Sequence, residues 1–155
     1  MAQEIERKFL VVSDAWRAAV TASARYRQGY LANTGQCSVR VRIAEDGAWL
    51  NIKSATLDIV RTEYEYPLPI ADAERMLADF CQGVVVEKRR YFVDYEAHTW
   101  EVDVFEGANR GLVVAEIELA REDSRFPLPP WVGAEVSSDP RYYNVYLAQH
   151  PFTQW

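Results

Sequence analysis

Apolar and polar residues alternate with a period of two along most of this 155-residue chain. Successive side chains of a β-strand point to opposite faces of a sheet, so this period predicts strands with one apolar and one polar face. Turn-forming residues separate the alternating stretches, and we expect eight antiparallel strands. They cover residues 4–12, 25–32, 37–45, 48–55, 59–68, 84–95, 99–105 and 112–120. Between the third and fourth strands, Asp46-Gly47 predicts a tight hairpin turn.

Three other segments have the features of helices. Residues 13–23 begin with Ser13 and Asp14, either of which can cap the first N–H groups of a helix. Residues 71–81 carry apolar side chains at the spacing of one helix face, which indicates packing on an apolar surface. Residues 139–149 begin with an aspartate and a proline, a pair suited to the first turn of a helix.

The polar faces of the predicted strands carry almost only charged residues, often as R-x-R or E-x-E pairs. The basic members are Lys8, Arg40, Arg42, Lys53, Arg61, Lys88 and Arg90. The acidic members are Glu4, Glu6, Glu63, Glu65, Glu101, Asp103, Glu116 and Glu118. If eight strands close into a barrel with the helices packed outside, these side chains line a lumen wide enough for one small ligand.

An open sheet with one face in water gives the same alternation, and the pattern alone leaves that alternative open. However, a solvated face normally mixes Ser, Thr, Asn and Gln among its charges, and the apolar faces have amphipathic helices available to cover them. We therefore predict an α+β fold, a closed eight-stranded antiparallel β-barrel with a charged lumen. No repeat or linker interrupts it, so residues 1–155 form a single domain.

Enclosed charges need partners, because moving an ion out of water costs on the order of several kcal/mol. Arg and Lys side chains suit phosphate oxygens, and carboxylates suit hard cations such as Mg²⁺. A lumen with both kinds of side chain is therefore suited to a phosphate chain accompanied by divalent metal ions.

Composition narrows the classes of function. The net charge of -6 and the pI of about 5.0 argue against binding nucleic acid through a basic surface. Neither a signal peptide nor a membrane span is apparent, so we expect a cytoplasmic protein with no membrane partner. Cys37 and Cys81 are far apart in the sequence and form no CxxC pair, which favours free thiols over a zinc site.

Five residues at the start of the first predicted strand, Glu4-Ile5-Glu6-Arg7-Lys8, resemble the ExExK motif of the CYTH superfamily, the triphosphate tunnel metalloenzymes. Further motifs follow in the family's order over nearly the whole chain. They are Gln28-Gly29-Tyr30-Leu31, Arg40-x-Arg42, Lys53, Glu63-x-Glu65, Glu87-Lys88-Arg89-Arg90-Tyr91, Glu101-x-Asp103-x-Phe105 and Glu116-x-Glu118. The short length and the tail motif, residues 139–144, are most similar to small bacterial members that hydrolyse inorganic triphosphate.

The resemblance implies roles for these residues. It implies metal binding by Glu4, Glu6, Glu116 and Glu118, with Glu63 and Asp103 nearby or acting through water. It implies phosphate binding by Lys8, Arg40, Arg42, Lys53, Arg61, Lys88 and Arg90. For Arg61, Glu65 and Glu101, an orienting role is the alternative. Lys8 and Tyr30 resemble a lysine and tyrosine pair of the short triphosphatases, implying a catalytic role in orienting the terminal phosphate or supplying a proton.

The resulting expectation is an enzyme that uses Mg²⁺ or Mn²⁺ to hydrolyse tripolyphosphate to pyrophosphate and phosphate. The alternatives are a class IV adenylate cyclase-like activity, thiamine triphosphate hydrolysis, and a non-catalytic module that binds polyphosphate or a nucleotide. The expected partner is a small-molecule triphosphate. The oligomeric state stays open, with a homodimer as one option.

Overall fold

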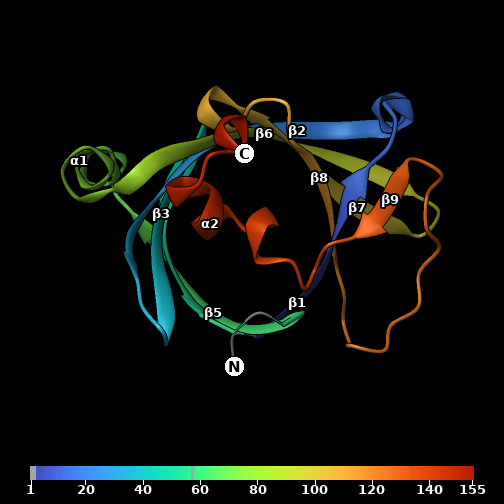
Figure 1. Cartoon of the computed structure of the whole chain (residues 1–155), viewed down its shortest axis with the longest axis horizontal. Coiled ribbons are helices and arrows are strands. Elements are labelled where there is room, and N and C mark those ends of the chain that lie inside the picture. Colours follow the sequence, from blue (N-terminus) through green and yellow to red (C-terminus); the bar gives the residue numbers. More distant parts are fainter. Residues whose placement is uncertain (1–2, 57) are drawn as a thin grey trace.

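The strands of the chain form a closed ring in the computed structural model, which describes residues 3–56 and 58–155. They form a nine-stranded sheet in the order β5-β4-β3-β2-β6-β7-β8-β1-β9 (Figure 1). The strands are β1 (Gln3–Val11), β2 (Val20–Asn33), β3 (Cys37–Ala44), β4 (Gly47–Ser54), β5 (Val60–Leu68), β6 (Gln82–Tyr95), β7 (His98–Glu106), β8 (Val113–Glu118) and β9 (Val132–Glu135). Strand β1 also pairs with β5, with Gln3 opposite Thr62, and this pairing closes the barrel.

All eight predicted strands are present, and the predicted closed antiparallel barrel is confirmed. The ninth strand, β9, was not predicted. It pairs with Phe9 and Val11 of β1, beyond the three residues of β1 that pair with β5. With four residues and no clear alternation, β9 has a weak sequence signal, and its position depends on an edge of β1 that β5 leaves uncovered.

The prediction of a helix over residues 13–23 is wrong for its second half. Only a short 3-10 helix, Ala15–Ala19, forms there, and β2 begins at Val20. Val20 pairs with Val93 of β6, and the buried Trp16 ring lies 5.1 Å from that of Tyr91. Pairing with β6 therefore outweighs the weak local preference for helix in this stretch.

The hairpin between β3 and β4 forms one residue earlier than predicted. Its turn consists of Glu45 and Asp46, while Gly47 already pairs with Ala44 as the first residue of β4. A Cβ atom at Gly47 would lie 3.1 Å from the Trp49 ring, so the glycine makes room for a side chain.

Helix α1 (Ile70–Phe80) confirms the second predicted helix and packs on the outside of the barrel. Leu77 contacts the buried Val41 and Ile43 of β3. Gly29 of β2 allows this close approach, because a Cβ atom there would lie 2.7 Å from Leu77 and 2.6 Å from the Cys81 sulfur. The outer faces of β3 and β4 are thus covered by α1.

The third predicted helix forms in two pieces, a 3-10 helix, Pro140–Tyr142, and α2 (Asn144–Gln149). Asp139 caps the first piece by accepting a hydrogen bond from the Arg141 backbone N–H at 3.1 Å. Contrary to the expectation that the helices lie outside, α2 lies within one end of the ring (Figure 1). The inward-facing residues at that end are apolar and receive Leu147 and Ala148 of the helix. They include Tyr30, Val86, Phe105 and Val114.

Two further expectations concern the whole chain. The described residues contain no helix that is both long and apolar enough to cross a membrane. Both cysteines, Cys37 and Cys81, are free thiols, as predicted.

Candidate functional site

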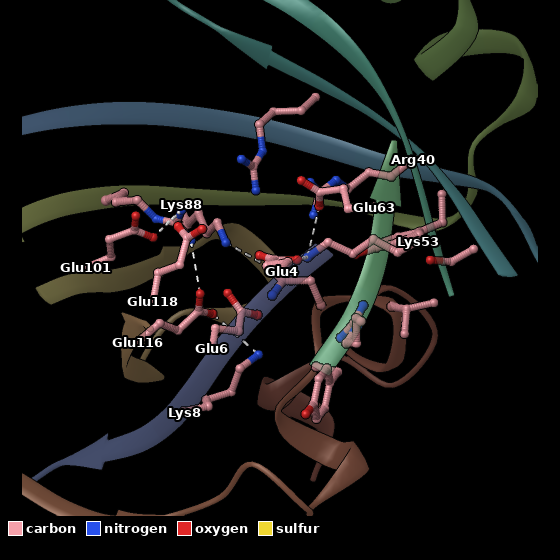
Figure 2. A pocket seen from close by; sticks show the side chains of 18 residues that line it. Glu4, Glu6, Lys8, Arg40, Lys53, Glu63, Lys88, Glu101, Glu116 and Glu118 are labelled. Carbon is pink, nitrogen blue, oxygen red and sulfur yellow. Dashed lines mark hydrogen bonds and ion pairs between the residues drawn. The ribbon is translucent and has the colours of Figure 1, made fainter. Parts of the chain in front are cut away.

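The charged faces of the strands surround a cavity of about 180 Å³ inside the barrel (Figure 2). Its wall includes seven basic and six acidic side chains. The basic ones are Lys8, Arg40, Arg42, Lys53, Arg61, Lys88 and Arg90, and the acidic ones are Glu4, Glu6, Glu63, Glu101, Glu116 and Glu118. Because these side chains enclose a cavity, the alternative of a sheet with its charged face in open water is wrong.

The two signs of charge are sorted around the ring. Strands β7, β8, β1 and β5 are consecutive neighbours and carry all six carboxylates of the cavity wall, and we call these carboxylates the acidic arc. Strands β4, β3 and β6, with β2 between the last two, carry five basic residues that we call the basic arc. These five are Lys53, Arg40, Arg42, Lys88 and Arg90. Among the residues of the cavity wall, only Lys8 of β1 and Arg61 of β5 are basic residues on strands of the acidic arc.

Ion pairs connect the two arcs along the wall, where β4 of the basic arc lies beside β5 of the acidic arc. Lys53 Nζ lies 2.9 Å from Glu4 and 3.2 Å from Glu63. Burial opposes the charge of Lys53, but Glu6 and Glu4 raise its pKa, so this ammonium stays protonated. The charged form of Glu118 is disfavoured, since burial raises its pKa and repulsion from Glu4 and other carboxylates also raises it. The acidic arc therefore holds negative charge that the protein compensates only in part.

Asp103 lies just behind the cavity wall and is 1% exposed. It accepts hydrogen bonds from Lys88 Nζ at 2.7 Å and from the Arg90 guanidinium at 2.8 and 2.9 Å. Burial opposes its ionisation, but Arg90 and Lys88 hold its pKa well below the ordinary value for an aspartate. This carboxylate is thus fully engaged with two cations of the basic arc.

Crowding and burial disfavour positive charge at two members of the basic arc, Arg42 and Lys88. At Lys53 and Arg90 burial also opposes the charge, but nearby carboxylates raise the pKa of both. Burial, together with the neighbouring Arg40 and Arg90, lowers the pKa of Arg42 to about 10. Burial, aided by repulsion from Arg90 and Arg42, also lowers the pKa of Lys88 to about 7, although the attraction of Asp103 opposes this shift. The buried Nε of Arg40 and of Arg61 has no hydrogen-bond partner among the described residues. An anion in the cavity would relieve both conditions, by balancing the charge and accepting these hydrogen bonds.

Lys8 and Tyr30, the predicted catalytic pair, both line the cavity. Lys8 Nζ lies 3.4 Å from Glu116, donates to the Tyr142 carbonyl at 3.1 Å, and lies 4.3 Å from the centre of the Tyr143 ring. The aromatic ring closest to this ammonium is thus that of Tyr143, from the tail motif. Tyr30 packs in the apolar cluster around α2.

The sequence did not single out four residues of the cavity wall, namely Ser38, Tyr143, Asn144 and Val145. Three of them belong to or follow the tail motif at residues 139–144, which had been used only as a mark of resemblance. Its position in the chain gave no signal that it would fold back into the barrel. Glu65, by contrast, is exposed and accepts a hydrogen bond from Asn51 at 2.7 Å outside the cavity wall.

The acidic arc fits a divalent cation in its chemistry. In the described ranges 3–56 and 58–155, no three His, Cys, Asp or Glu side chains gather as a ready-formed metal centre. The ammonium of Lys53 instead stands between Glu4 and Glu63. Hard carboxylate oxygens are the donors that Mg²⁺ and Mn²⁺ prefer. Burial and then repulsion from Glu4 and Glu6 raise the pKa of Glu118, and a divalent cation would relieve that repulsion. The donor set therefore fits such a cation once Lys53 moves aside.

Fold and cavity together define a β-barrel protein with an enclosed site of sorted charges. Residues 2–143 match the family described as the CYTH domain, and the chain belongs to that family. A curated relative from Acetivibrio thermocellus, named inorganic triphosphatase, is 45% identical over 152 residues, covering 98% of this chain and 97% of its own. A second, from Nitrosomonas europaea and named likewise, is 38% identical over 150 residues, covering 94% of this chain and 96% of its own.

Solved structures of other proteins share the fold of this chain. The crystal structure of an inorganic triphosphatase is 36% identical with a TM-score of 0.70, covering 96% of this chain and 95% of that one. A conserved hypothetical protein from Pyrococcus furiosus shares the fold at 16% identity and a TM-score of 0.61, covering 77% of this chain and 80% of that one. The barrel is thus retained where most of the sequence has changed.

Proposed function

We propose that this protein hydrolyses inorganic triphosphate to pyrophosphate and phosphate inside the barrel. The observation that carries the proposal is the sorting of charge around one small cavity, with five basic side chains on the basic arc and six carboxylates on the acidic arc. Relatives that match over nearly their whole length are named inorganic triphosphatase, which supports the same substrate.

Charge balance supports a divalent cation as the second component. Even with every group ionised, the seven basic and six acidic side chains of the cavity wall carry a single positive charge in excess, whereas triphosphate carries several negative charges. The acidic arc would hold Mg²⁺ or Mn²⁺ through Glu4, Glu6, Glu116 and Glu118, with Glu63 nearby. A cation bound there supplies charge neutralisation and a bound water of lowered pKa.

The protein's own residues do the positioning. Arg40 and Arg42 are suited to bind phosphate oxygens in pairs, and Lys53 and Lys88 add movable ammonium groups. Asp103 holds Lys88 and Arg90 in place from behind, so we assign it an orienting role toward these cations. Phosphoryl transfer depends mainly on such positioning and on charge neutralisation, with water attacking in line with the bond that breaks.

Two residues of the cavity wall, Lys8 and Tyr30, are proposed to act on the terminal phosphate. The Lys8 ammonium is held by the Tyr142 carbonyl and the Tyr143 ring, with Glu116 as its acidic neighbour. From there it would orient the terminal phosphate oxygens, and the Tyr30 side chain, which also lines the cavity, would supply the proton.

A second cavity favours a second candidate function, hydrolysis of an organic triphosphate. This cavity has a volume of about 360 Å³ and shares Ser38, Arg61, Tyr143 and Val145 with the charged cavity. The rest of its wall is mostly uncharged, with hydroxyl, amide and aromatic side chains. Such a lining suits the organic group of a nucleoside or thiamine triphosphate better than more phosphate.

A substrate panel decides between the two candidates. Purified protein is incubated with tripolyphosphate, ATP or thiamine triphosphate, each with Mg²⁺ or Mn²⁺, and phosphate release is measured. We expect tripolyphosphate to react fastest, and Glu118→Gln to remove the activity while the melting temperature stays near that of the wild type. Faster hydrolysis of an organic triphosphate would support the second candidate, and cyclic AMP as the main product would refute both.

A further inference from the structure

The first residue of helix α2, Asn144, reaches the basic arc. Its Oδ1 atom accepts a hydrogen bond from Lys88 Nζ at 3.1 Å and another from Gln28 Nε2 at 2.9 Å. Asn144 is 9% exposed and lines the charged cavity. Lys can only donate hydrogen bonds, so the oxygen of the Asn144 amide must face it.

Gln28 extends this contact to a second cation. Its Oε1 atom accepts a hydrogen bond from Arg42 Nε at 3.0 Å, while its amide nitrogen donates to Asn144. Gln28 is 0% exposed, and on β2 it lies between its paired residues Arg42 of β3 and Val86 of β6. Both ends of its amide are therefore used, and one side chain connects Arg42 to the C-terminal helix.

The ammonium of Lys88 has three N–H donors. One is directed to Asp103 at 2.7 Å and one to Asn144 at 3.1 Å. These two acceptors lie on β7 and α2, on different parts of the chain. Two fixed acceptors leave a single donor for a ligand in the cavity and restrict the direction in which it points.

We propose that Asn144, acting with Gln28, is a positioning residue that fixes Lys88 and Arg42 for phosphate binding. The reaction it serves is the proposed hydrolysis, so this inference rests on the proposed function. The proposal gives the tail motif a role in the site. When α2 packs inside the barrel, Asn144 supplies the acceptor for Lys88 and contacts Gln28, the acceptor for Arg42. Neither amide contacts the reacting atoms in this proposal.

The hydrogen bonds of Asn144 and Gln28 limit the expected effect of their replacement to Lys88 and Arg42. Without the Asn144 oxygen, Lys88 keeps only Asp103, which it already shares with Arg90. Lys88 is then drawn away from the cavity toward that carboxylate. Without Gln28, the Arg42 Nε loses its acceptor, and the buried guanidinium takes several orientations. Triphosphate would meet two cations that must first be ordered, which weakens binding.

The test uses Asn144→Leu, Gln28→Met and the double variant in the full-length protein. Calorimetry of tripolyphosphate binding without metal measures phosphate affinity independently of turnover, and steady-state kinetics with Mn²⁺ give KM and kcat. We expect each single variant to raise the metal-free Kd and the KM about tenfold, with kcat changed less than about threefold. Because both act through one network, the double variant should lose much less than the product of the two single effects.

Leu147→Ala and Gln149→Ala are the matched controls on the same helix. Leu147 is fully buried and supports α2 without contacting a cation, so its truncation should lower the melting temperature and leave Kd and KM nearly unchanged. Gln149 is exposed, and its truncation should change neither property. Should Asn144→Leu fail to fold, Gln28→Met and its comparison with Leu147→Ala still test the network.

Three results would overturn the inference. They are an unchanged Kd in Gln28→Met, equal Kd losses in Leu147→Ala and Asn144→Leu, and strictly multiplicative effects in the double variant. Failure of the proposed function looks different, because wild-type protein would then bind tripolyphosphate without metal, with these same differences between variants, but release no phosphate from it.

Discussion

The ammonium of Lys53 lies 2.9 Å from the carboxylate of Glu4, so a cation of the basic arc is already paired with the acidic arc. Such a pair is stable without any ligand. A triphosphate and a divalent cation must separate it, with the ammonium moving to phosphate and the carboxylate to the cation. The two components are therefore expected to assist each other's binding.

Replacement of Glu4 by Gln should separate phosphate binding from hydrolysis. The variant loses a carboxylate of the acidic arc, so hydrolysis with Mn²⁺ should fall about hundredfold or more. At the same time Lys53 loses one of its two carboxylate partners and keeps only Glu63, so tripolyphosphate should bind several-fold more tightly without metal. Phosphate release and metal-free calorimetry measure the two effects.

Glu74→Gln is the control for that prediction. Glu74 pairs with Arg27 on the outer surface, so its replacement should leave both measurements unchanged. If Glu4→Gln hydrolysed tripolyphosphate at the wild-type rate, Glu4 would not belong to the metal site.

Replacement of Asp103 by Asn should destabilise the fold and weaken its acid sensitivity. Removing one partner of a buried ion pair costs about 3–5 kcal/mol, so the free energy of unfolding at pH 7 should fall by that order. The folded-state pKa of Asp103 is lowered, mainly by Arg90, so its contribution to stability is present above pH ~4 and is lost as the pH falls below that value.

Urea unfolding at pH 7, 5, 4 and 3 checks both parts of the Asp103 prediction. The wild type should lose more stability than Asp103→Asn between pH 5 and pH 3. Parallel pH profiles for the two proteins would show that Asp103 does not carry this acid sensitivity.

Triphosphate binding should take up a proton at Lys88. Burial lowers the pKa of this ammonium to about 7 in the free protein, so above pH 7 it is mostly neutral. A bound phosphate favours the charged form and raises the pKa, so binding at pH 8 should be accompanied by proton uptake and should weaken as the pH rises further. Metal-free calorimetry in buffers of different ionisation enthalpy measures the number of protons.

Lys88→Met separates this uptake from protonation of the ligand itself. The variant should retain the part that belongs to tripolyphosphate and lose the remainder. Equal uptake in the two proteins would contradict a neutral Lys88.

Replacement of Gly29 by Ala should strain the contact between the barrel and α1. The added Cβ would lie 2.6 Å from the Cys81 sulfur and 2.7 Å from Leu77, closer than atoms normally pack. Overpacking of this kind costs about 1–3 kcal/mol in unfolding free energy. Addition of Cys81→Ala should recover part of that loss in urea unfolding, and no recovery would place the strain elsewhere.

The alternation of side chains predicted the strands and the faces they present, because one period determines both. The choice of a closed barrel over an open sheet also needed the almost purely charged polar faces and the amphipathic helices available to cover the apolar ones. The same parity put all seven predicted cations in the cavity wall, together with Glu4, Glu6, Glu63, Glu116 and Glu118. These positions follow from local geometry, since residues two apart in a strand share a face.

What the sequence could not provide depends on contacts between distant segments. Asp103 has the same parity as Glu101, yet Lys88 and Arg90 draw it behind the wall. The contribution of Asn144 arises from the folding of the chain's end into the barrel, which no local pattern encodes. The strand that begins at Val20 has a similar origin, because its partner is Val93.

The sorting of charge into two arcs has a consequence for the reaction medium. Water around a phosphate chain must reorient as charge shifts during bond breaking, and that reorientation costs free energy. Apart from Lys53, which must leave Glu4, the strands hold most of these charges in place before any ligand arrives, so folding has completed much of that reorientation in advance. The charged side chains of the barrel thus take the place of water and already face the charge that develops as the bond breaks.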